Sequence, residues 1–248
     1  MERTITVIIP SLNEEGNIEN TFTEVLEAID DRFSDHEILL FDDGSTDRTG
    51  AIIDELAARH KNVKAIHNGK NMGFGYNFKK GVSMARMNYV SIIPGDNEIL
   101  GSSIKAMFSL VGSADIVIPF TMNMEVRPFS RCLLSHLFTL ILNSIFRCML
   151  HYYNGPIIHR RDVITKVPIQ TNGFAFQAMA LVKLIRSGHS FVEVGMYLRP
   201  RRSSRSTALK FKNVVSVFGA IARLFWEVCI TNRNQYSVSV QRVMPQKN

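Results

Sequence analysis

The sequence predicts an α/β fold in which helices flank a mostly parallel central sheet, within a chain of 248 residues. Short apolar runs typical of buried strands alternate with stretches of helical period, and this alternation is the pattern of βαβ units. A chain of this length can bury a substantial core without splitting into separate domains. The expected strands lie near 4–9, 37–42, 63–67, 89–93 and 115–119, and the expected helices near 15–30, 47–60, 74–87 and 101–112.

Three of the expected strands end in acidic or amide side chains. In chain order, these residues are Asn13 and Glu14, then Asp42, Asp43 and Asp47, then Asp96 and Glu98. Ligands bind outside the carboxyl ends of the strands in open parallel sheets, so these side chains should converge on one site. Two carboxylates about 4 Å apart repel each other by roughly 4 kcal/mol at an effective dielectric of about 20, so a cation is expected among them. Hard oxygen donors such as Asp96 and Glu98 suit Mg²⁺ or Mn²⁺ that carries substrate phosphates. Alternatively, the aspartates after the second strand only shape a turn and cap a helix.

The second expected helix has a start signal and an apolar face. Thr46 and Asp47 can cap its first turn. Its apolar residues at helical spacing are Ile52, Ile53 and Leu56.

The glycines that follow disfavour two common nucleotide-binding folds. Gly73 and Gly75 lack the third glycine of a dinucleotide-binding fingerprint, and Gly69-Lys70 is not a phosphate-binding P-loop. A Rossmann dehydrogenase and a P-loop kinase are therefore not expected.

Charge is divided unevenly along the chain. Residues 1–100 carry 10 Lys or Arg against 17 Asp or Glu, whereas residues 101–248 carry 19 against 5, and the net charge of the whole chain is +7. We expect the acidic half to hold the cation and the basic half to face phosphates. A basic surface of this size could also meet RNA or an anionic membrane. Its basic residues are rarely interleaved with aromatic ones, which disfavours nucleic acid.

Two long amphipathic helices are expected in the C-terminal half, at 130–150 and 213–230. Polar and charged residues interrupt the first, so it is not expected to cross a bilayer: Arg131, His136, Asn143 and Arg147. Helices of this type can lie in the headgroup layer of a membrane. The alternatives are packing against the core and a subunit interface.

Three motifs together resemble the signatures of family 2 glycosyltransferases, and within that family those of the polyprenol-phosphate (dolichol-phosphate) sugar synthases. The motifs are Ile8-Ile9-Pro10-Ser11-Leu12-Asn13-Glu14, Asp42-Asp43-Gly44-Ser45-Thr46-Asp47 and Asn71-Met72-Gly73-Phe74-Gly75. The resemblance covers about residues 4–210. It implies a GT-A fold, which takes a nucleotide sugar with a divalent cation. Residues 1–210 would form the glycosyltransferase domain, and 211–248 a C-terminal amphipathic helix and tail.

The resemblance also implies roles for particular residues. The nucleotide-sugar-binding positions would be Pro10, Asn13, Glu14, Asp42, Asp43, Asn71, Gly73, Asp96 and Gln177. Among them, Asp42 would read the base or the ribose. Asp96 and Glu98 match the metal-binding Asp-x-Asp of the family, with Glu in place of the second Asp.

A basic stretch at 201–207 resembles the Arg-x-x-Gly-x-Ser-Lys loop with which the family holds pyrophosphate and acceptor phosphate. The Gly and Lys of the motif are replaced, but forked arginine donors suit phosphate oxygens. Together with Asp96, the expected catalytic residues are Arg201, Arg202 and Arg205. The alternative is a solvated or headgroup-binding turn.

The segment 171–180 contains no carboxylate, and this bears on the acceptor. Transfer to a sugar hydroxyl needs a general base, normally a positioned carboxylate. A phosphate monoester, with a second pKa near ~6, is already largely a dianion at neutral pH. The segment therefore favours a phosphate acceptor, unless the fold brings in a distant carboxylate: Asp115, Glu125, Asp162, Glu193 or Glu227.

The sequence thus predicts a transferase that moves a sugar from a GDP- or UDP-sugar to a polyprenyl phosphate, with Mg²⁺ or Mn²⁺ and with inversion. It would be cytoplasmic and peripherally attached to the cytoplasmic face of a membrane, as a homo-oligomer or with a separate anchor subunit. The widely spaced Cys132, Cys148 and Cys229 are expected to be reduced thiols. The alternatives are a glycosyltransferase that extends a saccharide hydroxyl and a catalytically silent membrane-associated subunit of the same fold.

Overall fold

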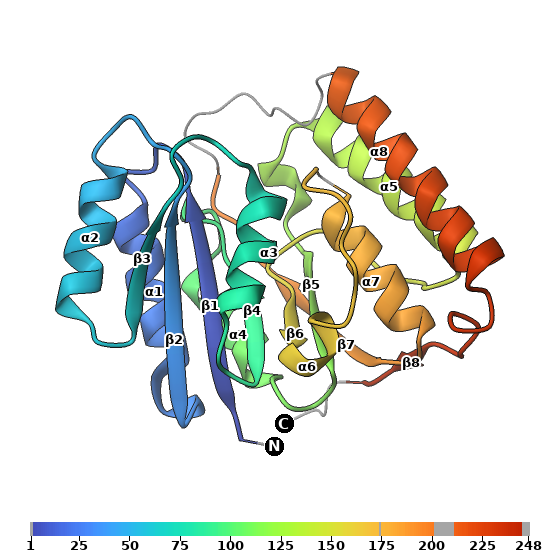
Figure 1. The fold of residues 1–248 in the computed structure, drawn as a ribbon, viewed down its shortest axis with the longest axis horizontal. Coiled ribbons are helices and arrows are strands. Elements are labelled where there is room, and N and C mark those ends of the chain that lie inside the picture. Colours follow the sequence, from blue (N-terminus) through green and yellow to red (C-terminus); the bar gives the residue numbers. More distant parts are fainter. Residues whose placement is uncertain (1, 174, 201–210, 245–248) are drawn as a thin grey trace.

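The structure, a computed structural model, describes residues 2–173, 175–200 and 211–244 and confirms the predicted α/β fold. Its strands form one sheet in the order β3-β2-β1-β4-β6-β5-β7-β8 (Figure 1). Their bounds are β1 (Thr4–Ser11), β2 (Asp35–Asp42), β3 (Val63–His67), β4 (Tyr89–Ile92), β5 (Ile116–Thr121), β6 (Ile158–Arg160), β7 (Ser190–Met196) and β8 (Gln241–Arg242). Neighbouring strands are parallel, except that β6 runs antiparallel to β4 and β5.

Helices cover both faces of the sheet (Figure 1). Their bounds are α1 (Ile18–Ile29), α2 (Thr49–Arg59), α3 (Phe74–Met84), α4 (Gly101–Ser109), α5 (Phe129–Phe146), α6 (Arg161–Ile164), α7 (Phe176–Arg186) and α8 (Phe211–Phe225), which a π-helix (Trp226–Thr231) extends. Side chains of α1, α2 and α4 pack into one hydrophobic cluster, and those of α3, α5, α6, α7 and α8 into a second.

Strand β1 explains why these residues form a sheet with two covered faces. Every residue of β1 is buried. Val7 and Ile9 join the cluster with α1, whereas Ile8 between them joins the cluster with α3. Successive side chains of a strand point to opposite faces, so a continuous apolar run fills both. The structure confirms the predicted strands, which were recognised in the sequence from apolar runs of this kind.

Helix α2 begins slightly later than predicted, at Thr49. Asp47 lies just before it, and its Oδ1 accepts hydrogen bonds from the Thr49 backbone N (3.0 Å) and from the Thr49 Oγ1 (2.6 Å). Burial would raise the pKa of Asp47, but the hydrogen bonds from Thr49 outweigh it and lower that pKa. The predicted apolar face is confirmed, since Ile53 and Leu56 are buried.

Strands β6 and β7 were not predicted. β6 is only three residues long and contains His159 and Arg160. β7 is only partly buried and carries Glu193 and Gly195, so its alternation of apolar residues is obscured. β8 was not predicted either, and it pairs with β7 in parallel.

Two titratable groups of the core are held in their neutral forms. Burial lowers the pKa of His159 to about 3, and its ring packs 6.1 Å from that of Phe78. Burial raises the pKa of the Cys148 thiol to about 11. All three cysteines are free, as predicted. Both groups are buried in the packed core, and burial disfavours their charged forms.

Helix α5 exposes much of its apolar surface. Of its 18 residues, only Leu142 and Phe146 are buried. By length and composition, it is the one helix among the described residues that could cross a membrane. Its two buried residues join the cluster that includes α7 and α8. Its exposed large apolar side chains are Phe129, Leu133, Leu134, Leu137 and Leu140.

Candidate active site

Backbone hydrogen bonds bring the loops after four neighbouring strands to one edge of the sheet. Asp43 N donates to Ser11 O (2.9 Å), Asn68 N to Asp42 O (2.9 Å) and Gly95 N to Pro10 O (3.0 Å). The bonds continue the parallel pairing of β1 with β2, β2 with β3 and β1 with β4 beyond the strand ends. The carboxyl ends of these strands therefore meet at one edge, as the sequence predicts.

The loop after β1 is fastened to the loop after β2. The Asn13 Oδ1 accepts from Thr46 N (2.8 Å), and Asn13 N donates to Ser45 Oγ (3.0 Å). Glu14 N donates to Thr49 Oγ1 (2.8 Å). Asn13 has a φ of 56°, a left-handed conformation that asparagine tolerates better than most residues. The first two motifs thus form one structural unit.

Asp42 is buried at the end of β2 and is held by two donors. Its Oδ1 accepts from Ser45 N (2.8 Å), and its Oδ2 lies 3.1 Å from His67 Nδ1. Burial would raise the pKa of Asp42, but the hydrogen bonds from Ser45 and His67 outweigh it and lower that pKa. Asp42 is therefore an oriented carboxylate, and its binding to the base or ribose stays a prediction.

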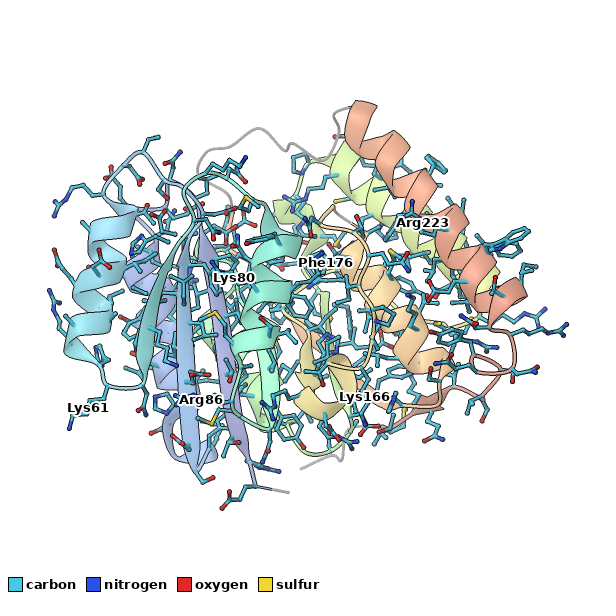
Figure 2. The ribbon with its side chains drawn as sticks, in the orientation of Figure 1. Lys61, Lys80, Arg86, Lys166, Phe176 and Arg223 are labelled. Carbon is cyan, nitrogen blue, oxygen red and sulfur yellow. The ribbon has the colours of Figure 1, made fainter. Side chains whose placement is uncertain are left out.

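Asp43 organises the third motif from inside the protein. Its Oδ1 accepts from the Asn68 side chain and from Met72 N, and its Oδ2 accepts from Gly73 N, each at 2.9 Å. Lys80 of α3, labelled in Figure 2, donates to Asn68 Oδ1 (3.1 Å). Asp43 thus fixes the chain that leads into α3. A direct contact of Asp43, Gly73 or the exposed Asn71 with the donor stays a prediction.

Asp96 and Glu98 lie in the turn after β4, which packs closely on β1. A Cβ atom on Gly95 would lie only 2.1 Å from Ser11 Oγ, so glycine allows this approach without moving the Ser11 side chain. Asn97 has a φ of 51°, and Glu98 N donates to Asp96 Oδ1 (3.2 Å). The turn therefore begins beside Ser11, whose register partner is Asp42, and carries the two carboxylates.

This pair of carboxylates fits a divalent cation that also binds substrate phosphates. Among the described residues, no group of three or more His, Cys, Asp or Glu could hold a metal ion by itself. Mg²⁺ commonly takes one or two protein carboxylates and completes its shell with water and phosphate oxygens. The donor set of Asp96 and Glu98 has that chemistry, so its role as the metal site remains a proposal.

Arg199 supports the turn that carries Asp96 and Glu98, and the sequence analysis did not single it out. It follows β7, and its backbone N donates to Glu98 O (2.7 Å). Its Nη1 donates to Asn97 Oδ1 (2.9 Å) and to Ile99 O (2.8 Å), and its Nη2 donates to Glu24 Oε1 (2.5 Å). Arg199 therefore clamps the turn that carries Asp96 and Glu98. Its place beside the predicted arginines was the only sequence signal.

The remaining predicted residues lie elsewhere. Gln177, at the start of α7, accepts from Gly155 N (3.0 Å) and donates to Gly155 O (2.5 Å), which shapes the loop before β6. Its binding to the nucleotide sugar stays a prediction. The predicted catalytic arginines fall outside the described residues: Arg201, Arg202 and Arg205.

A hollow of about 290 Å³ lies between α7, α8 and the loop before α7, in the basic C-terminal half of the chain. Arg223, labelled on α8 in Figure 2, lines it with Thr171 and Met179. Gly219 has no atom within 4 Å of an ideal Cβ position, which helps to leave the space open. The hollow combines apolar lining with a guanidinium group.

Comparisons with known proteins agree with this arrangement. The model of a family described as "Glycosyl transferase family 2" matches residues 6–167. The polyprenol monophosphomannose synthase of Mycolicibacterium smegmatis is 28% identical over 206 residues, which are 78% of this chain and 76% of that protein. Glycosyltransferase GlyG of Streptococcus pneumoniae is 28% identical over 120 residues, which are 48% of this chain. The dolichyl-phosphate beta-glucosyltransferase ALG5D of Trichomonas vaginalis is 31% identical over 97 residues, or 37% of this chain. These matches span only 39% of GlyG and 30% of ALG5D.

Solved structures share the fold. Glucosyl-3-phosphoglycerate synthase of Mycobacterium tuberculosis, in complex with Mn²⁺, UDP and phosphoglyceric acid, has a TM-score of 0.66 at 17% identity, covering 92% of this chain and 79% of that one. TarS of S. aureus, in complex with UDP-GlcNAc, has a TM-score of 0.64 at 16% identity, covering 94% of this chain and 69% of that one. The predicted GT-A fold is confirmed, and the chain belongs to glycosyl transferase family 2.

Proposed function

We propose that the protein transfers a sugar from a GDP- or UDP-sugar to a polyprenyl phosphate, with a divalent cation and with inversion at the anomeric carbon. The names of its relatives in M. smegmatis and T. vaginalis support a polyprenol or dolichyl phosphate acceptor. The fold is shared with proteins solved with UDP or UDP-GlcNAc, which supports a nucleotide-sugar donor. The acidic edge of the sheet supplies the donor side.

The choice of acceptor rests on the carboxylates of the basic half. All five of them after residue 100 are described, and four are held in ion pairs. The pairs are Asp115 and Asp162 with Arg160 (2.5 and 2.6 Å), Glu193 with Arg242 and Glu227 with Lys183 (2.7 Å). The fifth, Glu125, is exposed in a short 3₁₀ turn. A hydroxyl acceptor would need a free carboxylate as base, which among these five leaves Glu125, whereas a phosphate dianion attacks without one. The four ion pairs therefore favour a phosphate acceptor.

At the donor side, the residues of the edge would bind and orient the nucleotide sugar. Asp42 and Asn13 would face the nucleoside, and Arg199 would keep Asp96 and Glu98 aimed at the diphosphate. A divalent cation, when bound there, would offset the negative charge of the departing diphosphate. Arg201, Arg202 and Arg205 would do the same from the other side.

The proposed transfer needs no proton acceptor on the protein. An oxygen of the acceptor phosphate forms a bond to the anomeric carbon, and the bond from that carbon to the diphosphate oxygen breaks with its electron pair. A single displacement of this kind inverts the anomeric configuration. The protein's contribution is then mainly orientation and electrostatic stabilisation.

We expect purified protein with Mg²⁺ or Mn²⁺ to release GDP or UDP from its sugar donor when polyprenyl phosphate is added. The matched control is the polyprenyl alcohol of the same length, which lacks the phosphate and should give no release. Product analysis by mass spectrometry should find the glycosyl polyprenyl phosphate. Release with free saccharides but not with polyprenyl phosphate would favour the hydroxyl-extending alternative.

The same proposal places α5 and the end of α8 against a membrane. Phe129 on α5 is 81% exposed, and Trp226 just after α8 is 65% exposed. Further exposed apolar side chains on α8 and its extension are Phe218, Phe225 and Ile230. Aromatic side chains of this kind favour the headgroup layer, and a lipid-borne acceptor requires the enzyme to reach it. Attachment to the cytoplasmic face of the membrane is part of the proposal.

Trp226 is the single tryptophan of the chain, so its fluorescence reports directly on this contact. We expect its emission to shift to shorter wavelength when vesicles of anionic phospholipid are added. Phe129→Ser should weaken vesicle binding by about tenfold or more, because burying a large apolar side chain contributes about 1.5–3 kcal/mol. Met244→Ser, at an equally exposed side chain beyond β8, is the control and should bind as the wild type does. Emission that shifts with protein concentration and not with vesicles would indicate a subunit interface instead.

A further inference from the structure

His67 lies between two carboxylates at the end of β3. Its Nδ1 lies 3.1 Å from Asp42 Oδ2, and its Nε2 lies 2.9 Å from Asp54 Oδ1 on α2. A Cβ atom on Gly50 would lie 2.9 Å from Asp42 Oδ2 and 3.6 Å from His67 Cε1, so glycine at this position leaves room for the contact. The chain thus builds an Asp42–His67–Asp54 array, with one carboxylate at each ring nitrogen, beside the nucleoside end of the proposed donor site.

His67 donates a hydrogen bond to both carboxylates only when its imidazole ring carries two protons. A protonated ring donates to both carboxylates, whereas a neutral ring has one donor and one acceptor nitrogen. In the neutral ring, one of the two carboxylates therefore faces a lone pair. If that carboxylate is Asp42, it keeps Ser45 N as a donor but loses its second one.

Both charges that face His67 are negative. Hydrogen bonds with Asp54 and then Asp42 raise the pKa of His67 above its ordinary value of 6.5. The other charged side chains of the packed elements have partners of their own: Arg59 on α2 pairs with Glu55 (3.1 Å), and Lys64 on β3 pairs with Glu37 (3.2 Å). The protonated ring also reduces the negative charge of the edge that must receive an anionic diphosphate.

We propose that His67 is a positioning residue for the donor nucleotide: its doubly protonated ring holds Asp42 in its binding orientation, and nucleotide affinity falls when the ring loses a proton. The inference rests on the proposed function, because it takes Asp42 to contact the nucleoside. In the folded protein the ring is doubly protonated below its raised pKa, so nucleotide affinity should be highest there. Affinity should fall as the pH rises through that raised pKa.

The test is the binding of GDP and UDP to the full chain with Mg²⁺, measured by calorimetry from acidic to alkaline pH. We expect the affinity of the preferred nucleotide to fall by about tenfold as the pH rises, the size expected for one charge-assisted hydrogen bond. Asp54→Asn removes one of the two carboxylates, and its side chain is 63% exposed, so the fold should tolerate the change. In that variant the fall should occur at lower pH, while affinity at the acidic end stays unchanged.

Two further variants make the result specific. His67→Gln cannot titrate, so its nucleotide affinity should no longer change over this pH range. His60→Gln, at a histidine that contacts Phe22 (5.0 Å between ring centroids) and not the acidic edge, should keep the wild-type profile. Tight binding with a flat wild-type profile, or an unmoved profile in Asp54→Asn, would overturn the role of His67 alone. No binding of either nucleotide by the wild type at any pH would overturn the proposed function as well.

Discussion

Asp96→Ala is expected to lower kcat/KM by about a thousandfold or more, because it removes one of the two carboxylates proposed to hold the cation. The stabilisation that a bound metal gives to a leaving phosphate is worth several kcal/mol, and about 4 kcal/mol corresponds to a factor of about a thousand. The side chain lies in a surface turn and is only partly buried, so the fold should persist. Initial rates at increasing Mn²⁺ concentration, with circular dichroism of the variant, check this.

The matched control for this variant is Asp35→Ala. Asp35 is exposed at the amino end of β2, at the opposite edge of the sheet, where its Oδ1 accepts only a local bond from His36 N (2.8 Å). Its removal should leave the rate unchanged. Near-normal turnover in Asp96→Ala would remove the acidic turn from the mechanism.

Arg199→Gln is expected to lower kcat/KM by about a hundredfold and to raise the Mn²⁺ concentration needed for half-maximal activity. The variant cannot keep the contacts with Asn97, Ile99 and Glu24 together, so the turn that carries Asp96 should shift. A displacement of about 1 Å at a reacting group can cost about a hundredfold in rate. The free energy of unfolding should also fall by about 1–3 kcal/mol, because Glu24, whose side chain is 22% exposed, loses its partly buried partner.

Lys105→Ala is a control from the same helical layer. Lys105 on α4 pairs with Glu27 on α1 at 3.6 Å, and their side chains are 43% and 61% exposed. An exposed pair contributes only about 0–1 kcal/mol, and this one touches no residue of the acidic turn. Activity, Mn²⁺ dependence and melting temperature should therefore stay near those of the wild type. If Arg199→Gln kept the wild-type Mn²⁺ dependence, the clamp would have no role in placing the carboxylates.

Much of the N-terminal half of the fold could be predicted because its signals are local. Strands β1, β2 and β4 are apolar runs buried on both faces, and parallel strands of this kind need no alternation to be recognised. The side chains that end them are consecutive with the runs, so parallel pairing alone brings Asp42 and Asp96 to one edge. The C-terminal half was harder, because β6 is short and pairs antiparallel between two strands of distant sequence.

The contacts that each side chain makes within the site could not be predicted from local signals of this kind. Asp42 and Asp43 are neighbours in sequence, yet Asp42 meets His67, whereas Asp43 turns to Asn68 and the amide of Gly73. Adjacent residues at the end of a strand point to opposite faces, and which face leads to the ligand depends on the helices that cover it. The sequence predicted that both residues bind the nucleotide sugar, and it did not predict that their hydrogen-bond partners within the protein differ.

By itself, the sequence determined the order of strands and helices from β1 to β5, the acidic edge and the membership of the family, because each depends on short-range patterns of apolar and polar residues. Only the tertiary structure decided which side chains support the site. Arg199 reaches Glu24 across 175 positions, and His67 reaches Asp42 and Asp54 from another strand. Such contacts depend on directed hydrogen bonds between distant segments, which leave no periodic pattern in the chain.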